Sequence, residues 1–183
     1  MVEPLGTVFA AVPIPVEIRM ALADSVSALD IPGRRVPPED WHVTLRFLGR
    51  IERVTLERFM HGLAPIADVP RFRFGLRGLG AFPQPRKATV VWVGIGRGLQ
   101  SLSVLNEMTE EAVVGAGLVF EDKPFRPHLT LSRVRPPQDV TNLLDNEVRL
   151  DWWCDRVVVY ETRPPGEPVH YRPLETILLA GTG

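Results

Sequence analysis

The 183-residue chain contains a single cysteine, Cys154. One cysteine cannot form an internal disulfide, so nothing in the sequence points to an oxidising compartment. The sequence also lacks any apolar run approaching the ~20 residues that a membrane-spanning helix needs, and residues 1–4 lack the basic stretch of a secretory signal. These absences predict a soluble, cytoplasmic protein that does not enter a membrane.

An excess of positive charge is missing as well. The chain has 21 Lys and Arg against 22 Asp and Glu, a formal net charge of −1, so its overall field does not favour tight, sequence-independent binding along a nucleic-acid backbone. Any contact with nucleic acid should therefore be local. The length fits one domain spanning residues 1–183, and 45% hydrophobic residues are enough for a core, so we expect a monomer that folds alone.

What the sequence does contain is one four-residue pattern that occurs twice. His42-Val43-Thr44-Leu45 and His128-Leu129-Thr130-Leu131 both read histidine, apolar, threonine, apolar, and 128 − 42 = 86 residues separate their histidines. In a strand, side chains alternate between faces, so each copy would present a His and a Thr on one face and bury two aliphatic residues on the other. The repeat predicts two similar lobes that contribute one motif strand each to a two-sided site.

The remaining pattern mixes strands and helices without strict alternation. We expect strands at residues 7–12, around both motifs, and at 72–82, 89–95, 148–160 and 171–179. We expect helices from Pro15 to the Pro32-Gly33 stop, at 56–63, at 99–114 before Gly115 and Gly117, and near 140–144, with turns at 83–86, 136–137 and 164–166. Several strands joined through turns favour an α+β fold with antiparallel pairing over a doubly wound parallel sheet.

The two motifs and their contexts resemble the 2H phosphoesterase superfamily, and specifically its bacterial LigT-type branch of RNA 2′,3′-cyclic phosphodiesterases, also called 2′,5′ RNA ligases. The similar blocks span nearly the whole chain, at residues 9–13, 41–49, 80–83, 124–131 and 159–161. The resemblance implies a bilobal α+β fold in which two pseudo-symmetric lobes of mostly antiparallel sheet, with helices packed outside, face a shared active-site cleft.

The same resemblance implies roles for five residues. His42 and His128 would be the catalytic pair, Thr44 and Thr130 would hydrogen-bond the substrate phosphate, and Arg133 would contact that phosphate. Strict alternation from His128 places Arg133 on the opposite face of the strand, so we expect a bulge or the strand end to turn it inward.

The chemistry of a 2′,3′-cyclic phosphate fits two histidines. Water attacks phosphorus in line with a departing ribose oxygen, which requires a base on one side and an acid on the other, and imidazole titrates near cellular pH. The hydroxyls and a guanidinium would stabilise the phosphoryl oxygens, so no cofactor and no metal is expected. The family implies a 2′-phosphate product and 2′,5′ joining as the reverse reaction, with His42 as the acid and His128 as the base, although the near-equivalent motifs leave the opposite assignment open.

Other residues near the motifs have more than one interpretation. Arg46 fits a phosphate or base contact and, equally, a solvated strand position. Alternation from His42 directs Trp41 and Phe47 away from the cleft, and we interpret these two, together with Phe82 and Phe125, as core residues and assign no base-stacking residue. The two histidines outside the motifs are His61, which we expect to be solvated, and His170, which we expect to be structural.

The residues and the family resemblance together leave three functions to consider. The leading one is a metal-independent phosphodiesterase acting on RNA ends or small nucleotides that carry a 2′,3′-cyclic phosphate. The first alternative is a non-catalytic RNA-binding module with the same fold, although a binding protein does not need both histidines. The second is a metal-dependent hydrolase, which is disfavoured because no Asp, Glu, Cys or third His lies at ligand spacing around either motif.

Overall fold

The computed structural model of the protein describes residues 5–163 and 170–181. Its main helices are α1 (Val16–Ser27), α2 (Arg53–Gly62) and α3 (Leu99–Gly115), and four short 3₁₀ segments are η1 (Pro38–Asp40), η2 (Ala64–Asp68), η3 (Pro85–Lys87) and η4 (Thr141–Leu143). Its strands are β1 (Val8–Pro13), β2 (Arg34–Arg35), β3 (His42–Gly49), β4 (Phe72–Phe82), β5 (Ala88–Arg97), β6 (His128–Gln138), β7 (Arg149–Cys154), β8 (Arg156–Thr162) and β9 (Tyr171–Leu178).

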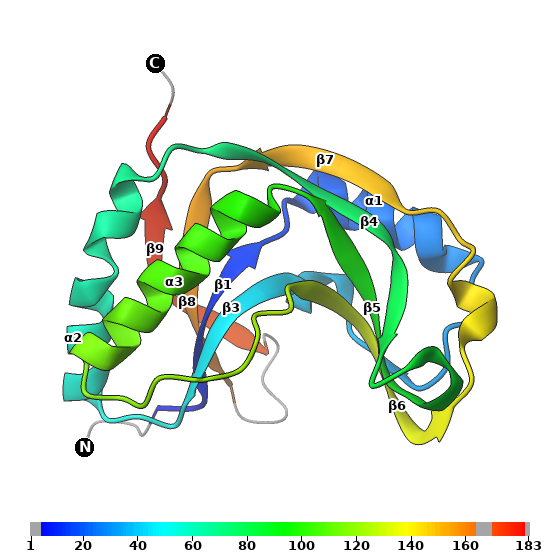
Figure 1. Ribbon diagram of the computed structural model, residues 1–183, viewed down its shortest axis with the longest axis horizontal. Coiled ribbons are helices and arrows are strands. Elements are labelled where there is room, and N and C mark those ends of the chain that lie inside the picture. Colours follow the sequence, from blue (N-terminus) through cyan, green and yellow to red (C-terminus); the bar gives the residue numbers. More distant parts are fainter. Residues whose placement is uncertain (1–4, 164–169, 182–183) are drawn as a thin grey trace.

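In the described residues, nine strands form one curled sheet, in the order β7-β4-β5-β6-β3-β1-β8-β9, with β2 paired to β6 (Figure 1). The named strands all pair antiparallel. The two motif strands are neighbours at the middle of this order, where Val43 of β3 lies opposite Leu129 of β6. The sheet confirms the expected α+β fold with antiparallel pairing.

The strand order divides the sheet into two halves, each made of a motif strand followed by three further strands. In the first lobe, the motif strand β3 is followed by β1, β8 and β9, and in the second lobe the motif strand β6 is followed by β5, β4 and β7. Helices α2 and α3 pack against each other, and α3 contacts β3 of the first lobe, whereas α1 contacts β7 of the second lobe (Figure 1). The arrangement agrees with two pseudo-symmetric lobes.

The apolar faces of these elements meet in one core. Val43 and Leu129 at the junction of the lobes are fully buried, as are Leu102 and Leu105 on α3. Helix α3 ends as the glycines predict, because Gly117 has φ +83° and the next amide, Leu118 N–H, donates to Val113 O. No helix within the described residues is long and apolar enough to span a membrane.

Three sequence-based boundaries differ from the structure, and a fourth is not tested by it. Helix α1 ends at Ser27, well before Pro32, because Leu29 N–H already donates to Val26 O in a tightened last turn. The Pro136-Pro137 pair lies inside β6 and is not a turn. The expected strand at 148–160 is two strands, because the chain leaves β4 at the edge of the second lobe and joins β1 in the first lobe, and Asp155 lies between them. The turn expected at 164–166 lies outside the described residues.

Candidate active site

The structure brings the five residues singled out in the sequence into one cavity. His42 and Thr44 of β3 line it from the first lobe, and His128, Thr130 and Arg133 of β6 line it from the second. The cavity has a volume of about 570 Å³. Among the described residues, neither threonine hydroxyl nor the Arg133 guanidinium has a hydrogen-bond or ion-pair partner, so all three groups are available to a ligand.

Both motif strands carry the same irregularity three residues after the histidine. Against β1, Ala11 pairs with Thr44 and Ala10 with Arg46, so Leu45 is an extra residue. Against β5, Trp92 pairs with Thr130 and Val91 with Ser132, so Leu131 is extra in the same way. A bulge of this kind reverses the alternation that follows it. The fifth residue after each histidine therefore lies on the cleft face.

These mirrored bulges decide which side chains enter the cleft. The fifth residue is Arg133 in the second lobe, which accounts for its presence in the cavity. In the first lobe it is Phe47, whose assignment to the core was wrong: it is 50% exposed and lines the same cavity. The two lobes thus repeat the His and Thr positions but differ in the next inward residue, a cation on one side and an aromatic ring on the other.

The two histidines are held by the same local contact. The Nδ1 atom of His42 lies 2.7 Å from the carbonyl oxygen of Asp40, and that of His128 lies 2.7 Å from the carbonyl oxygen of Arg126. A carbonyl oxygen can only accept, so Nδ1 carries a proton in both rings. In the neutral form of each histidine, Nε2 is therefore the unprotonated nitrogen, and it is free to exchange protons with a ligand.

Aromatic rings surround each imidazole. His42 lies 4.9 Å from Phe9 and 5.3 Å from Tyr171, measured between ring centroids, and the Tyr171 contact is edge-on. His128 lies 4.9 Å from Phe82, also edge-on, and 6.3 Å from Trp92. These contacts limit the orientations that each imidazole can adopt.

A glycine makes room for the indole ring beside His128. A Cβ atom on Gly80 would lie 2.2 Å from the Trp92 ring. Because that separation is far shorter than any van der Waals contact, the ring can occupy this place only if residue 80 has no side chain. Gly80 thereby allows the indole ring to lie beside the His128 imidazole.

Burial changes the protonation of both rings. Desolvation is the main effect that lowers the pKa of His42 below its ordinary value of 6.5, and the Arg133 and His128 charges add to it, while the hydrogen bond to Asp40 O opposes it. Desolvation also lowers the pKa of His128, with a further contribution from Arg133 and an opposing one from the bond to Arg126 O. The free site therefore favours two neutral imidazoles, and a bound anion would favour protonation.

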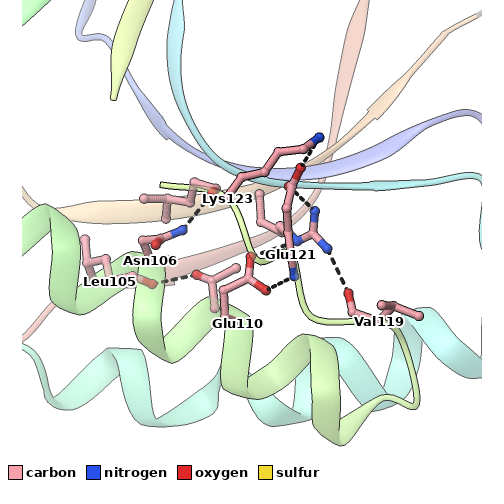
Figure 2. Close-up of polar contacts among 9 residues, drawn as sticks. Leu105, Asn106, Glu110, Val119, Glu121 and Lys123 are labelled. Atoms are coloured by element: carbon pink, nitrogen blue, oxygen red, sulfur yellow. Dashed lines mark hydrogen bonds and ion pairs between the residues drawn. The ribbon is translucent and has the colours of Figure 1, made fainter. Parts of the chain in front are cut away.

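Arg46 does not point into the cleft. Its guanidinium forms ion pairs with Glu110 on α3, at 2.8 Å, and with Glu121, and it donates to Val119 O (Figure 2). Lys123 forms a further ion pair with Glu121, with 3.2 Å between Nζ and Oε1 (Figure 2). The network attaches the segment that leads into His128 to the first lobe, so the interpretation of Arg46 as a phosphate contact is not supported by its contacts.

This segment also forms one wall of a second cavity. The cavity has a volume of about 740 Å³ and adjoins the first, since Thr44, Phe47 and His128 line both. Phe125 lies on its wall and is partly buried against the core. Trp41 is buried as expected, with its Nε1–H donating to Val36 O, whereas Phe82, which we assigned to the core, is instead the edge-on neighbour of His128.

The two remaining histidines have different surroundings. His61 is exposed on α2, as expected. His170 lines the cavity of the motif histidines, and its Nδ1 contacts the carboxylate of Asp40, whose own carbonyl holds His42. Tyr171 and Arg34 also line this cavity. No motif marks these three residues in the sequence. His170 and Tyr171 are far from both motifs along the chain, and Arg34 of β2 is close to β3 but far from β6, the strand with which β2 pairs.

Among the described residues, no three His, Cys, Asp or Glu side chains come together in a group that could hold a metal ion. The cavity places hydroxyl, guanidinium and aromatic groups around the His–His pair, together with the Asp40 carboxylate and the His170 ring that contacts it. Such a set can exchange protons through two imidazoles and bind an anion between them.

Comparison with known proteins agrees with this geometry. The model of the family described as LigT like Phosphoesterase matches residues 12–92. A protein of Aeropyrum pernix named RNA 2′,3′-cyclic phosphodiesterase is 37% identical over 123 residues, which cover 67% of this chain and 69% of that protein.

Solved structures share the fold. The crystal structure of TT0787 of Thermus thermophilus superposes with a TM-score of 0.75 at 28% identity, over 97% of this chain and 100% of that one. The crystal structure of E. coli LigT complexed with 3′-AMP superposes with a TM-score of 0.82 at 24% identity, over 97% of this chain and 99% of that one. The curled sheet and its three helices therefore belong to a known architecture.

Proposed function

The chain belongs to the LigT-like phosphoesterase family, and on that premise we propose that it hydrolyses 2′,3′-cyclic phosphates of RNA ends or nucleotides to 2′-phosphates. The observation that carries the proposal is the paired arrangement of His42 and His128 in one cavity, each with Nδ1 bound to a backbone carbonyl and Nε2 free. Two such imidazoles supply the base and the acid that an in-line displacement at phosphorus requires.

In the proposed reaction, His128 Nε2 accepts a proton from water as the water oxygen bonds to phosphorus. The bond between phosphorus and the ribose 3′ oxygen breaks, and His42 gives its Nε2 proton to that oxygen. The product has a 2′-phosphate and a 3′-hydroxyl. Replacement of water by a 5′-hydroxyl in the same displacement would join two RNA ends through a 2′,5′ linkage.

The pKa values of the histidines suit these roles once substrate is bound. Burial favours the neutral form that a base needs. The acid must be protonated, and the negative charge of a cyclic phosphate between the two rings stabilises an imidazolium. The side chains of Thr44, Thr130 and Arg133 have no hydrogen-bond or ion-pair partner among the described residues, and they would donate to the phosphoryl oxygens.

Turnover of adenosine 2′,3′-cyclic phosphate, with and without EDTA, tests the proposal. We expect 2′-AMP as the product, the same rate in both conditions, and a bell-shaped dependence of rate on pH because one imidazole must be neutral and the other protonated. Tight binding without turnover would favour an RNA-binding module. Loss of turnover on adding EDTA, with recovery on adding a divalent metal, would favour a metal-dependent hydrolase.

A further inference from the structure

Two arginines lie side by side on the wall of the cavity. Arg34 of β2 is directly opposite Arg133 of β6 in the antiparallel register. Residues that face each other across two strands point to the same side of the sheet, with Cβ atoms about 4.5–5.5 Å apart. Arg133 points into the cleft because of the bulge at Leu131, so Arg34 does too, and both side chains line the cavity.

Neither side chain of this pair has an ion-pair partner among the described residues, although the Asp40 carboxylate, which contacts His170, lines the same cavity. Like charges directly opposite each other destabilise a strand pair, yet within the described part of the chain neither the Arg34 nor the Arg133 guanidinium forms a hydrogen bond or an ion pair. Two arginines elsewhere in the sheet do have carboxylate partners, Arg77 with Asp151 and Arg172 with Glu161. Two unpaired guanidinium groups at one place fit a ligand with more than one negative charge.

The neighbouring arginine differs from this pair because it has a partner within the fold. Arg35 is paired with Ser132 and also lines the cavity, but its guanidinium donates to Leu29 O at 2.6 Å. Ser132 itself is buried, and its hydroxyl donates to Pro32 O. Arg35 thus stabilises the local fold, while Arg34, one residue earlier, is left for a ligand.

The two arginines of the pair differ in their places in the fold. Arg133 lies on the motif strand β6, five residues after His128, and its charge lowers the pKa of both catalytic histidines. Arg34 lies on β2, beside that strand, and lines the cavity together with Pro37 and Tyr171. A ligand that Arg133 holds therefore has a second cation beside it.

We propose that Arg34 binds the 5′-phosphate of the nucleotide whose cyclic phosphate Arg133 holds. The inference rests on the proposed function. A 2′,3′-cyclic phosphate ends the RNA chain, so the nearest other phosphate is the 5′-phosphate of the same nucleotide, which in RNA is the link to the preceding residue. The protein would thus prefer RNA ends, and 5′-phosphorylated nucleotides, over nucleosides that carry the cyclic phosphate alone.

The test compares two substrates that differ by one phosphate. Adenosine 2′,3′-cyclic phosphate with a 5′-phosphate should have a kcat/KM about 10-fold or more above that of its 5′-hydroxyl counterpart, as expected for a charge-assisted contact. Arg34→Gln should lower kcat/KM about 10-fold on the 5′-phosphorylated substrate and much less on the other, so the preference should collapse. Arg58→Gln removes the same charge from an exposed position on α2 that does not line the cavity, and it should keep the wild-type preference.

The outcomes separate this inference from the proposed function. Wild-type protein that turns over both substrates without preference overturns the inference alone, and this result does not depend on any variant folding. An equal fall on both substrates in Arg34→Gln overturns it too, because Arg34 would then act on the cyclic phosphate or on the fold. Turnover of neither substrate by the wild type overturns the proposed function and the inference with it.

Discussion

At the scale of single residues, the proposed mechanism assigns proton transfer to two histidines and phosphate binding to a set of donors, and substitutions should separate these roles. His42→Ala and His128→Ala should each lower kcat by about 10²- to 10⁴-fold, because one displacement needs both an acid and a base and neither ring can act as both at once. The double variant should lose little more than either single variant. Steady-state rates measure the effect, and circular dichroism spectra check that each variant is folded. Near-normal turnover by a folded single variant would remove that histidine from the mechanism.

The threonines should have a smaller effect than the histidines. Thr44→Val and Thr130→Val keep the β-branched shape and remove one donor each, which should reduce kcat by about 10²- to 10³-fold while the melting temperature changes little. Single-turnover rates and thermal unfolding of the same samples measure both quantities. If the hydroxyls only fill strand positions, both variants will turn over substrate like the wild type.

At the scale of elements, the Arg46 network ties α3 to the segment that carries His128. Glu110 is buried on α3, and its replacement would leave the Arg46 guanidinium with fewer partners in a mostly buried place. We expect Glu110→Gln to lower the free energy of unfolding by about 1–3 kcal/mol in urea titrations. Glu111→Gln, the exposed neighbour on the same helix, is the matched control, and an equal effect of both variants would argue against the network.

The elements also show where inference from the sequence succeeds and where it stops. The strands around His42 and His128, helix α3 with its end at Gly117, and the antiparallel pairing follow from local periodicity and from turn residues. The change of pairing partner at Asp155, from β4 to β1, cannot be inferred in this way, because the apolar pattern of a strand is the same whichever strand lies beside it.

The bulges mark the same limit at the site. An extra residue in one strand leaves no trace in the apolar pattern, so alternation alone placed Phe47 on the wrong face. Arg133 required a bulge to be assumed in order to reach the cleft. Arg34 joins the site because β2 pairs with β6, which is far along the chain. Tyr171 joins it because β9 pairs with β8, and β8 pairs with β1, the neighbour of β3. No local signal encodes these long-range neighbours.

At the scale of the whole molecule, the buried histidines couple folding to pH. Their pKa values are lowered in the folded protein, so the unfolded chain binds protons more readily below the ordinary value of 6.5. The free energy of unfolding should therefore be fully retained above pH 6.5 and fall as the pH falls from there toward the lowered values. Urea titrations between pH 7.5 and about pH 5 measure this slope.

The double variant His42→Gln, His128→Gln is the control for that slope. It cannot take up these two protons, so its stability should depend less on pH in this range. The aspartates with lowered pKa values, Asp139, Asp151 and Asp155, act in a separate window, because their stabilisation is lost only as the pH falls below their ordinary value of 3.8. An unchanged slope in the double variant would mean that other groups cause it.

The bond from each imidazole to the carbonyl two residues earlier has a consequence for how such a molecule could arise. In many proteins the tautomer of a histidine is set by a hydrogen bond to a carboxylate far away in the chain, so two distant positions must both be retained. Here a short length of chain contains both the ring and the group that sets its proton. Duplication of such a strand would copy the histidine together with the carbonyl that sets its tautomer. The fifth residue after each histidine could then diverge, to Arg133 in one copy and to Phe47 in the other, without a change at either histidine.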